Sequence, residues 1–251
     1  MKKTFKLIGI FALALLAGFT MASCDEDDEK NNGGEEKFSG KVITSNERGT
    51  SNGYDYEFWK NNNATGTMTL GKGGAFKCEW ANTGSGGNIL FRSGKRYDST
   101  QSHSTFGTFS IKYKAEYTPA SGISYLSVYG WTKNPLVEYY IVENYNGNYH
   151  PGTSGVKKGS FTVDGSVYDI YTRNMIQQPA VAGGGKYDFT QYISVRAQKR
   201  TSGTISVSEH FKKWHSLGMN MNGGFYEVTM KVEGYNSAGS AKLTENTLTR
   251  K

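Results

Sequence analysis

The sequence predicts an all-β fold, a β-sandwich or jelly roll with one short α-helix, and three observations lead to this class. The chain holds 32 Gly and 17 Tyr among its 251 residues, a composition that favours turns and strands over packed helices. Short strand-like segments recur along it, and turns rich in Gly and Asn separate them. One stretch, 206–218, breaks this pattern with apolar residues at helical spacing.

Ten segments are expected to form strands, because each is short, contains β-branched or aromatic residues and lies next to a turn. Residues 71–74 and 84–87 are Gly-rich turns, Asn134-Pro135 is another, and 234–239 is expected to turn as well. The expected strands, in chain order, are 54–59, 65–70, 75–80, 88–92, 124–131, 136–143, 160–163, 166–172, 187–198 and 226–233.

The helix is expected within 206–218. Phe211, Trp214 and Leu217 are spaced three apart and form one apolar stripe, which we interpret as core. Ser208 is a candidate N-cap, and Gly218 is suited to end the helix.

The N-terminus is typical of an exported lipoprotein. Three Lys precede a short apolar run at 7–17, which predicts a secretory signal, because a membrane span needs about 20 apolar residues. Met21-Ala22-Ser23-Cys24 resembles a bacterial lipobox, which implies cleavage before Cys24 and lipidation there. A plain signal peptide with an incidental Cys is the alternative.

The net charge of +7 combines segments of opposite sign. Residues 24–37 carry seven acidic and two basic residues, and 25–36 lack apolar ones, which predicts a flexible acidic tether. Residues 38–251 carry 24 basic and 15 acidic residues, but no recognition motif accompanies this excess, so we expect no nucleic-acid partner. The predicted organisation is a signal peptide at 1–23, the tether at 24–37 and one domain at 38–251.

Candidate chemistry lies on two strands. Side chains alternate along a strand, so Glu138 and Tyr140 share a face of 136–143. A carboxylate on a face rich in Tyr and Trp is a candidate for glycoside chemistry, and a solvated Glu on an outer face is the alternative. Near the C-terminus, Glu227, Thr229, Lys231 and Glu233 form the polar face of another strand, and the pattern does not choose between its two Glu residues.

These segments resemble family 11 glycoside hydrolases, the small endo-1,4-β-xylanases. Residues 129–143 are similar to the family's nucleophile strand and 232–239 to its acid/base strand. Weaker similarities run in order from about residue 50 to about 244, at 52–59, 168–172, 191–196 and 206–219.

The resemblance implies a β-jelly roll of two twisted antiparallel sheets around a cleft for xylan. It implies a retaining endo-1,4-β-xylanase with Glu138 as nucleophile and Glu233 as general acid and base, their carboxyls about 5–5.5 Å apart. It implies no cofactor and a monomer, and the four His residues show no metal-ligand spacing. With the lipobox, it implies a protein anchored by lipid in the outer membrane of a Gram-negative bacterium, at the cell surface.

Further site residues follow from the same resemblance. Asn88 is similar to the residue that bonds to the acid/base Glu, and Asn there is typical of members that work near neutral pH. Tyr129 and Tyr140 are similar to the tyrosines around the nucleophile. The expected substrate-binding residues are Trp59, which could instead be a buried core residue, and Tyr125, Gln191 and Pro179.

Two departures from the family pattern stand out. Met175 occupies the position of the family's usual Arg, and Arg173 lies two residues earlier, which puts a substrate-facing Arg in doubt. The thumb tip keeps Pro179 but continues into the Gly-rich segment 180–185, which predicts a mobile tip. Two other functions remain open, a glycan-binding protein that has lost catalysis and a β-glucanase of similar fold.

Overall fold

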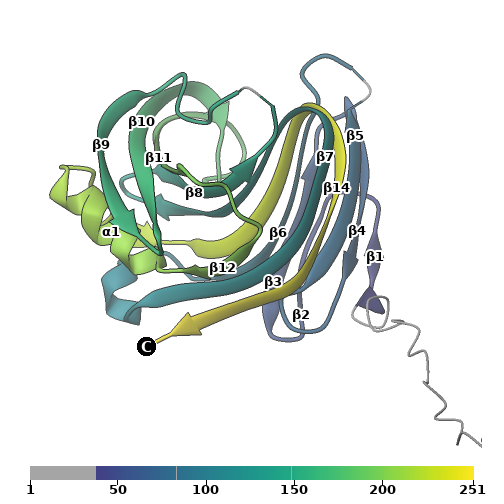
Figure 1. The fold of residues 1–251 in the computed structure, drawn as a ribbon, viewed down its shortest axis with the longest axis horizontal. Helices are drawn as coiled ribbons and strands as arrows, with labels where there is room; N and C mark the ends of the chain where they lie inside the picture. The colour runs from purple at the N-terminus through teal and green to yellow at the C-terminus, as the bar shows by residue number, and fades with distance from the viewer. Residues whose placement is uncertain (1–37, 83, 148) are drawn as a thin grey trace, which may run out of the picture. The chain divides into compact units, whose positions relative to one another are not determined.

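The computed structural model describes residues 38–82, 84–147 and 149–251 (Figure 1). The signal segment, Cys24 and the acidic tether lie outside the described residues. The elements, in chain order, are β1 (Val42–Ile43), β2 (Glu47–Ser51), β3 (Tyr54–Lys60), β4 (Ala64–Leu70), β5 (Phe76–Asn82), β6 (Asn88–Arg96), the 3-10 helix η3 (His103–Phe106), β7 (Phe109–Lys133), β8 (Val137–Tyr145), β9 (Val156–Val163), β10 (Ser166–Pro179), β11 (Lys186–Arg196), β12 (Ser202–Ile205), α1 (Val207–Ser216), β13 (Gly224–Phe225) and β14 (Glu227–Arg250).

The strands form two curved layers that share their longest members. The inner layer follows the order β2-β3-β6-β14-β7-β8-β11-β10-β9, and the outer layer follows β1-β4-β5-β14-β7 with β12 at its edge. The first part of β14 pairs with β6, and the part from Ala238 onward pairs with β5, so this strand passes from one layer to the other. In Figure 1, β7 and β14 run side by side through the bend.

The expected all-β class with one short helix is confirmed, and the structure refines it in two ways. The ladder of hydrogen bonds is continuous through β7 and β14, so the two layers belong to one folded sheet. The pairing is also not antiparallel throughout, because β8 and β11 run parallel, with Gln191 opposite Glu138. The expected turn at 234–239 is wrong, since β14 continues through it with register irregularities.

Apolar side chains fill the space between the layers. Alternation sends Phe58, Phe91 and Val232 into this core, while their neighbours in sequence point to the concave face of the inner layer. A second apolar cluster lies on that concave face and includes Tyr129, Trp131 and Tyr140 from adjacent strands. The curvature of the inner layer therefore gives the molecule a wall of aromatic side chains.

The helix α1 begins close to the predicted position. Phe211 and Trp214 are buried, as the spacing predicted, and the Trp214 indole donates to Ser194 Oγ at 2.9 Å. The predicted N-cap was wrong: Ser206 is the N-cap residue, and the Ser208 hydroxyl lies inside the helix and accepts a hydrogen bond from the Phe109 amide. The helix thus fixes β7 and β11 from the side opposite the concave face.

Candidate active site

A cleft of about 680 Å³ lies on the concave face of the inner layer. It is lined from β3, β6, β7, β8, β10, β11 and β14, so segments far apart in sequence contribute to it. Residues that pair across adjacent strands lie side by side, so the lining side chains form rows across the cleft. The structure brings all nine predicted catalytic, supporting and substrate-binding residues to this cleft, namely Trp59, Asn88, Tyr125, Tyr129, Glu138, Tyr140, Pro179, Gln191 and Glu233.

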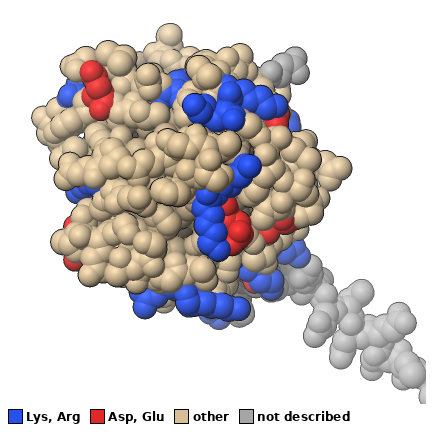
Figure 2. Space-filling model, turned by 90° about the vertical axis from the view of Figure 1, so that its left-hand side faces the viewer, with Lys and Arg blue, Asp and Glu red and all other residues tan. Residues whose placement is uncertain are grey.

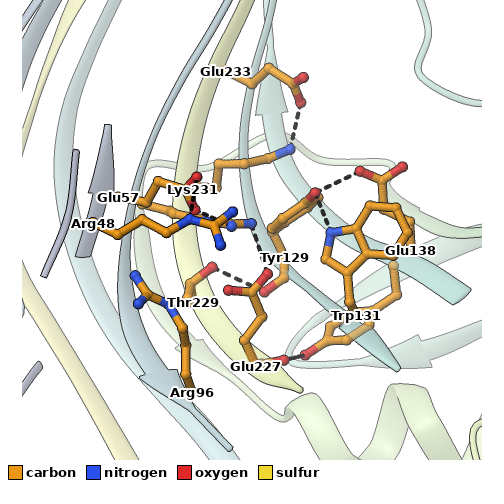
Figure 3. Close-up of polar contacts among 12 residues, drawn as sticks. Arg48, Glu57, Arg96, Tyr129, Trp131, Glu138, Glu227, Thr229, Lys231 and Glu233 are labelled. Atoms are coloured by element: carbon orange, nitrogen blue, oxygen red, sulfur yellow. Dashed lines mark hydrogen bonds and ion pairs between the residues drawn. The ribbon is translucent and has the colours of Figure 1, made fainter. Parts of the chain in front are cut away.

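Glu138 is held by three neutral donors. Its side chain is 7 % exposed, and its Oε1 accepts hydrogen bonds from the Tyr129 hydroxyl at 2.6 Å and the Tyr140 hydroxyl at 3.0 Å. Gln191 Nε2 donates to Oε2 at 2.5 Å from the parallel partner strand. The Trp131 indole donates to the Tyr129 hydroxyl at 2.6 Å, which fixes that hydroxyl in turn (Figure 3).

Both tyrosines remain donors across the pH range of ordinary enzymes. Burial raises the pKa of Tyr129 and of Tyr140 well above the usual value, and the adjacent Glu138 carboxylate adds to the rise. A protonated phenol donates without neutralising its partner. Glu138 is therefore oriented by phenols that stay protonated.

Glu233 lines the same cleft from β14. It is opposite Leu90 on β6 and Tyr125 on β7, and Leu90 is in turn opposite Trp59 on β3. Its Oε2 accepts a hydrogen bond from Lys231 Nζ at 2.5 Å, and the Lys231 side chain is 0 % exposed. Lys231 also lies against the Tyr129 ring, with Nζ 3.6 Å from the ring centroid.

The structure separates the two Glu residues that the sequence pattern left equivalent. Glu227 is fully buried, does not line the cleft and pairs with Arg92 at 2.7 Å. Arg92 also pairs with Glu57, which Arg48 contacts at 2.8 Å. Glu227 therefore belongs to a buried ion cluster, and Glu233 is the carboxylate that reaches the cleft.

Asn88 lines the same cleft, opposite Tyr235 on β14. Among the described residues its amide oxygen is buried and accepts no hydrogen bond. The bond to Glu233 that the resemblance implies stays a prediction, and in the structure Lys231 is the hydrogen-bond partner of Glu233.

Arg173 contributes a guanidinium to the cleft from β10. Its Nε donates to Gln191 Oε1 at 2.7 Å, so the amide of Gln191 presents its NH₂ group to Glu138. Arg173 and Met175 both line the cleft because residues two apart on a strand share a face. A displacement of the family's Arg by two positions therefore keeps an arginine on the substrate side.

The thumb tip connects β10 to β11 at the edge of the cleft. Pro179, Ala180 and Val181 line the cleft, and Gly183 and Gly184 adopt φ values of +81° and +67°. A Cβ at either glycine would meet no atom within 4 Å, so the tip is loosely packed. This is consistent with the predicted mobility, which stays a prediction.

Sequence reasoning gave no role to Lys231 or Arg173. The sequence contained a signal for both residues, because alternation along a strand puts Lys231 on the same face as Glu233 and Arg173 on the same face as Met175. Within the described residues, no group of three or more His, Cys, Asp or Glu side chains is arranged to hold a metal ion. No helix in that part of the chain has the length and apolar character of a membrane span.

Comparison with known proteins identifies the family. Residues 51–244 match the glycosyl hydrolases family 11. The chain is 52 % identical over 208 residues to endo-1,4-β-xylanase A of Bacillus pumilus, an alignment covering 83 % of this chain and 86 % of that protein. It is 44 % identical to endo-1,4-β-xylanase 2 of Rhizopus oryzae, over 81 % of this chain and 87 % of that one.

Solved structures agree with this assignment. The family 11 xylanase from Neocallimastix patriciarum superposes with a TM-score of 0.77 at 36 % identity, covering 84 % of this chain and all of that one. The family match, the relatives and the fold lead to one conclusion: the chain belongs to glycosyl hydrolase family 11.

Proposed function

We propose that the chain is a retaining endo-1,4-β-xylanase in which Glu138 is the nucleophile and Glu233 is the general acid and base. The observation that carries the assignment of residues is their contrasting environment in one cleft. Glu138 is oriented by three neutral donors, and Glu233 lines the same cleft in contact with the Lys231 ammonium. Family 11 membership and the named activity of its relatives support xylan as substrate.

The reaction proceeds in two displacements. The Glu138 carboxylate attacks the anomeric carbon of a xylose unit, the glycosidic C–O bond breaks, and Glu233 gives its proton to the departing oxygen. The result is a covalent xylosyl ester on Glu138. Glu233, now a carboxylate, takes a proton from water, and the resulting hydroxide attacks the anomeric carbon and releases Glu138.

Two variants test the assignment. Glu138→Gln and Glu233→Gln should each lower the release of oligosaccharides from xylan at least about 10²–10⁴-fold, the usual contribution of a catalytic proton donor or base. Glu116→Gln, at an exposed position on the outer layer, is the matched control and should keep the wild-type rate. Full activity in either cleft variant would overturn the assignment.

Intact-mass measurement distinguishes the two roles. With an aryl xylobioside whose leaving group needs no proton, Glu233→Gln should still form the ester on Glu138 but should hydrolyse it slowly, because the base is gone. A mass increase on the peptide that contains Glu138 is expected. The same substrate should leave Glu138→Gln unmodified. Rates on linear β-glucan measured beside those on xylan test the β-glucanase alternative, and xylan binding without turnover would support the binding-protein alternative.

The positive charge of the domain supports a preference for acidic xylans. Residues 38–251 carry 24 basic and 15 acidic residues, and Figure 2 shows Lys and Arg gathered in several groups on one face. The electric field of these positive charges raises the rate of encounter with an anionic polymer, and salt screens this field. Added salt should therefore slow attack on glucuronoxylan more than attack on uncharged xylan.

The anchoring proposal concerns residues outside the described part of the chain. We propose that Cys24 carries the lipid and holds the enzyme in the outer membrane, facing the cell surface, because a lipobox-like segment follows the predicted signal. In the expressing bacterium, wild-type enzyme should partition into the detergent phase and Cys24→Ser into the aqueous phase. Protease added to intact cells should digest the wild-type enzyme if it faces outward. Partition of the wild type into the aqueous phase would refute the lipid anchor.

A further inference from the structure

The Lys231 ammonium is buried between the two carboxylates of the cleft. Its side chain is 0 % exposed, and Nζ donates to Glu233 Oε2 at 2.5 Å. The same Nζ lies 3.6 Å from the centroid of the Tyr129 ring and 4.2 Å from that of Tyr140, the two rings whose hydroxyls hold Glu138. Figure 3 shows Lys231 extending toward Glu233 next to Tyr129.

A buried lysine in this position must be compensated, because burying an ammonium group costs free energy unless the group is paired. Glu233 and the two aromatic faces supply its compensation. Solvent screens a buried charge weakly, so the Lys231 ammonium acts strongly on a carboxylate in contact with it. Burial lowers the pKa of Lys231, and the Glu233 and Glu138 carboxylates oppose that shift.

We propose that Lys231 is a positioning residue that holds Glu233 toward the cleft and sets the pH at which Glu233 stops acting as an acid. This inference rests on the proposed function of Glu233. When Glu233 gives its proton to the leaving oxygen, the ammonium 2.5 Å away stabilises the carboxylate that forms. The same contact limits activity at high pH, because a cation favours the ionised carboxyl of the free enzyme.

The other ionisable groups around this pair remain in place when Lys231 alone is changed. The difference between wild type and variant therefore isolates the lysine charge. These groups are Tyr125 and Tyr129 on β7, Glu138 and Tyr140 on β8, Arg92 on β6 and Glu227 on β14.

The test is the pH profile of kcat/KM on an unmodified xylo-oligosaccharide, whose departing sugar oxygen needs a proton from the general acid. In Lys231→Met the carboxyl keeps its proton to a higher pH, so the alkaline limb should move upward by about one pH unit or more, as expected for loss of a charge in contact. Lys231→Thr should move the limb in the same direction. Lys231→Arg keeps a cation, and its limb should not rise.

Lys242→Met is the matched control, because Lys242 lies on the same strand but is exposed on the outer layer, paired with Glu116. Its limb should coincide with that of the wild type. Circular dichroism at each pH measures the folded fraction of every variant, so that unfolding is separated from a shift of the limb. An unchanged or lowered limb in both Lys231→Met and Lys231→Thr would overturn the inference.

The proposed function is judged separately in the same assay. If Glu138→Gln and Glu233→Gln are inactive while the Lys231 variants keep the wild-type limb, the catalytic assignment stands and only the role of Lys231 fails. If Glu233→Gln keeps its rate, the catalytic assignment itself fails, whatever the Lys231 variants show.

Discussion

Replacement of Arg92 by Met should destabilise the enzyme strongly while leaving its shape intact. Arg92 bridges Glu57 and Glu227, and its side chain and that of Glu57 are each 5 % exposed. Glu227 is 0 % exposed. Arg92→Met has similar volume, so its main effect is to leave two buried carboxylates without their shared cation.

The magnitude follows from the burial of the partners. Removing one member of a buried ion pair costs about 3–5 kcal/mol, because the remaining charge stays desolvated and unpaired. For a domain of this size about 2–4 °C of melting temperature corresponds to each kcal/mol, so the melting temperature should fall by about 10 °C. Calorimetry at pH 7, with guanidinium unfolding as a second measurement, gives both quantities.

Arg48→Met provides the matched control. Arg48 contacts the same Glu57 at 2.8 Å, but its side chain is 49 % exposed. A solvated pair of this kind contributes at most about 1 kcal/mol. If Arg92→Met is no less stable than Arg48→Met, the reasoning from burial is refuted.

The cost should also depend on pH. Burial alone would raise the pKa of Glu57, but Arg92 and Arg48 outweigh burial and lower it below its ordinary value. A lowered carboxyl pKa gives stability that is present above the unfolded-state value and is lost as pH falls through the folded-state value. The difference between wild type and Arg92→Met should therefore shrink in acid, and the triple variant that also carries Glu57→Gln and Glu227→Gln should recover part of the loss at pH 7.

Three further predictions concern the cleft. Tyr129→Phe removes a hydrogen bond to the charged Glu138, so kcat/KM should fall about tenfold to a hundredfold, with xylan assays as the measurement. Arg173→Thr removes the donor that orients the Gln191 amide, so kcat should fall. Adding Met175→Arg to that variant should restore part of the lost kcat. Full activity of Arg173→Thr alone would contradict a role for this contact. NMR relaxation should show faster backbone motion at 180–185 than in β10 and β11, and rigid order parameters there would refute a mobile thumb tip.

Alternation along the strands was predictable from the sequence, and it assigned Glu138 and Tyr140 to one face of their strand. The choice of Glu233 over Glu227 and the other site residues came from the family resemblance, because alternation alone does not say which faces meet. The partners across strands were not predictable from alternation, since register depends on strands that lie far apart in sequence. The parallel pairing that brings Gln191 to Glu138 is of this kind.

The lengths of β7 and β14 were underestimated for a specific physical reason. Gly122 and Asn236 have positive φ values and look like turn residues, but a Cβ on Gly122 would lie 2.0 Å from the Asn236 carbonyl oxygen. The two strands bend together at this point and continue. Gly239 is likewise required by the Trp80 ring, 2.6 Å from where its Cβ would be. Glycine is suited both to close packing and to a chain reversal, so the sequence pattern does not distinguish the two.

The partners of the glutamates explain why two of them suit catalysis. Glu143 and Glu227 are fully buried and each pairs with an arginine, a group that keeps its charge at every pH an enzyme meets. These contacts hold both carboxylates away from the cleft, which neither of them lines. Glu138 instead accepts hydrogen bonds from two tyrosines and Gln191, and Glu233 contacts Lys231, whose pKa burial lowers. The roles proposed for Glu138 and Glu233 therefore agree with their positions, because these two carboxylates line the cleft and can reach a substrate while the two arginine-paired carboxylates cannot.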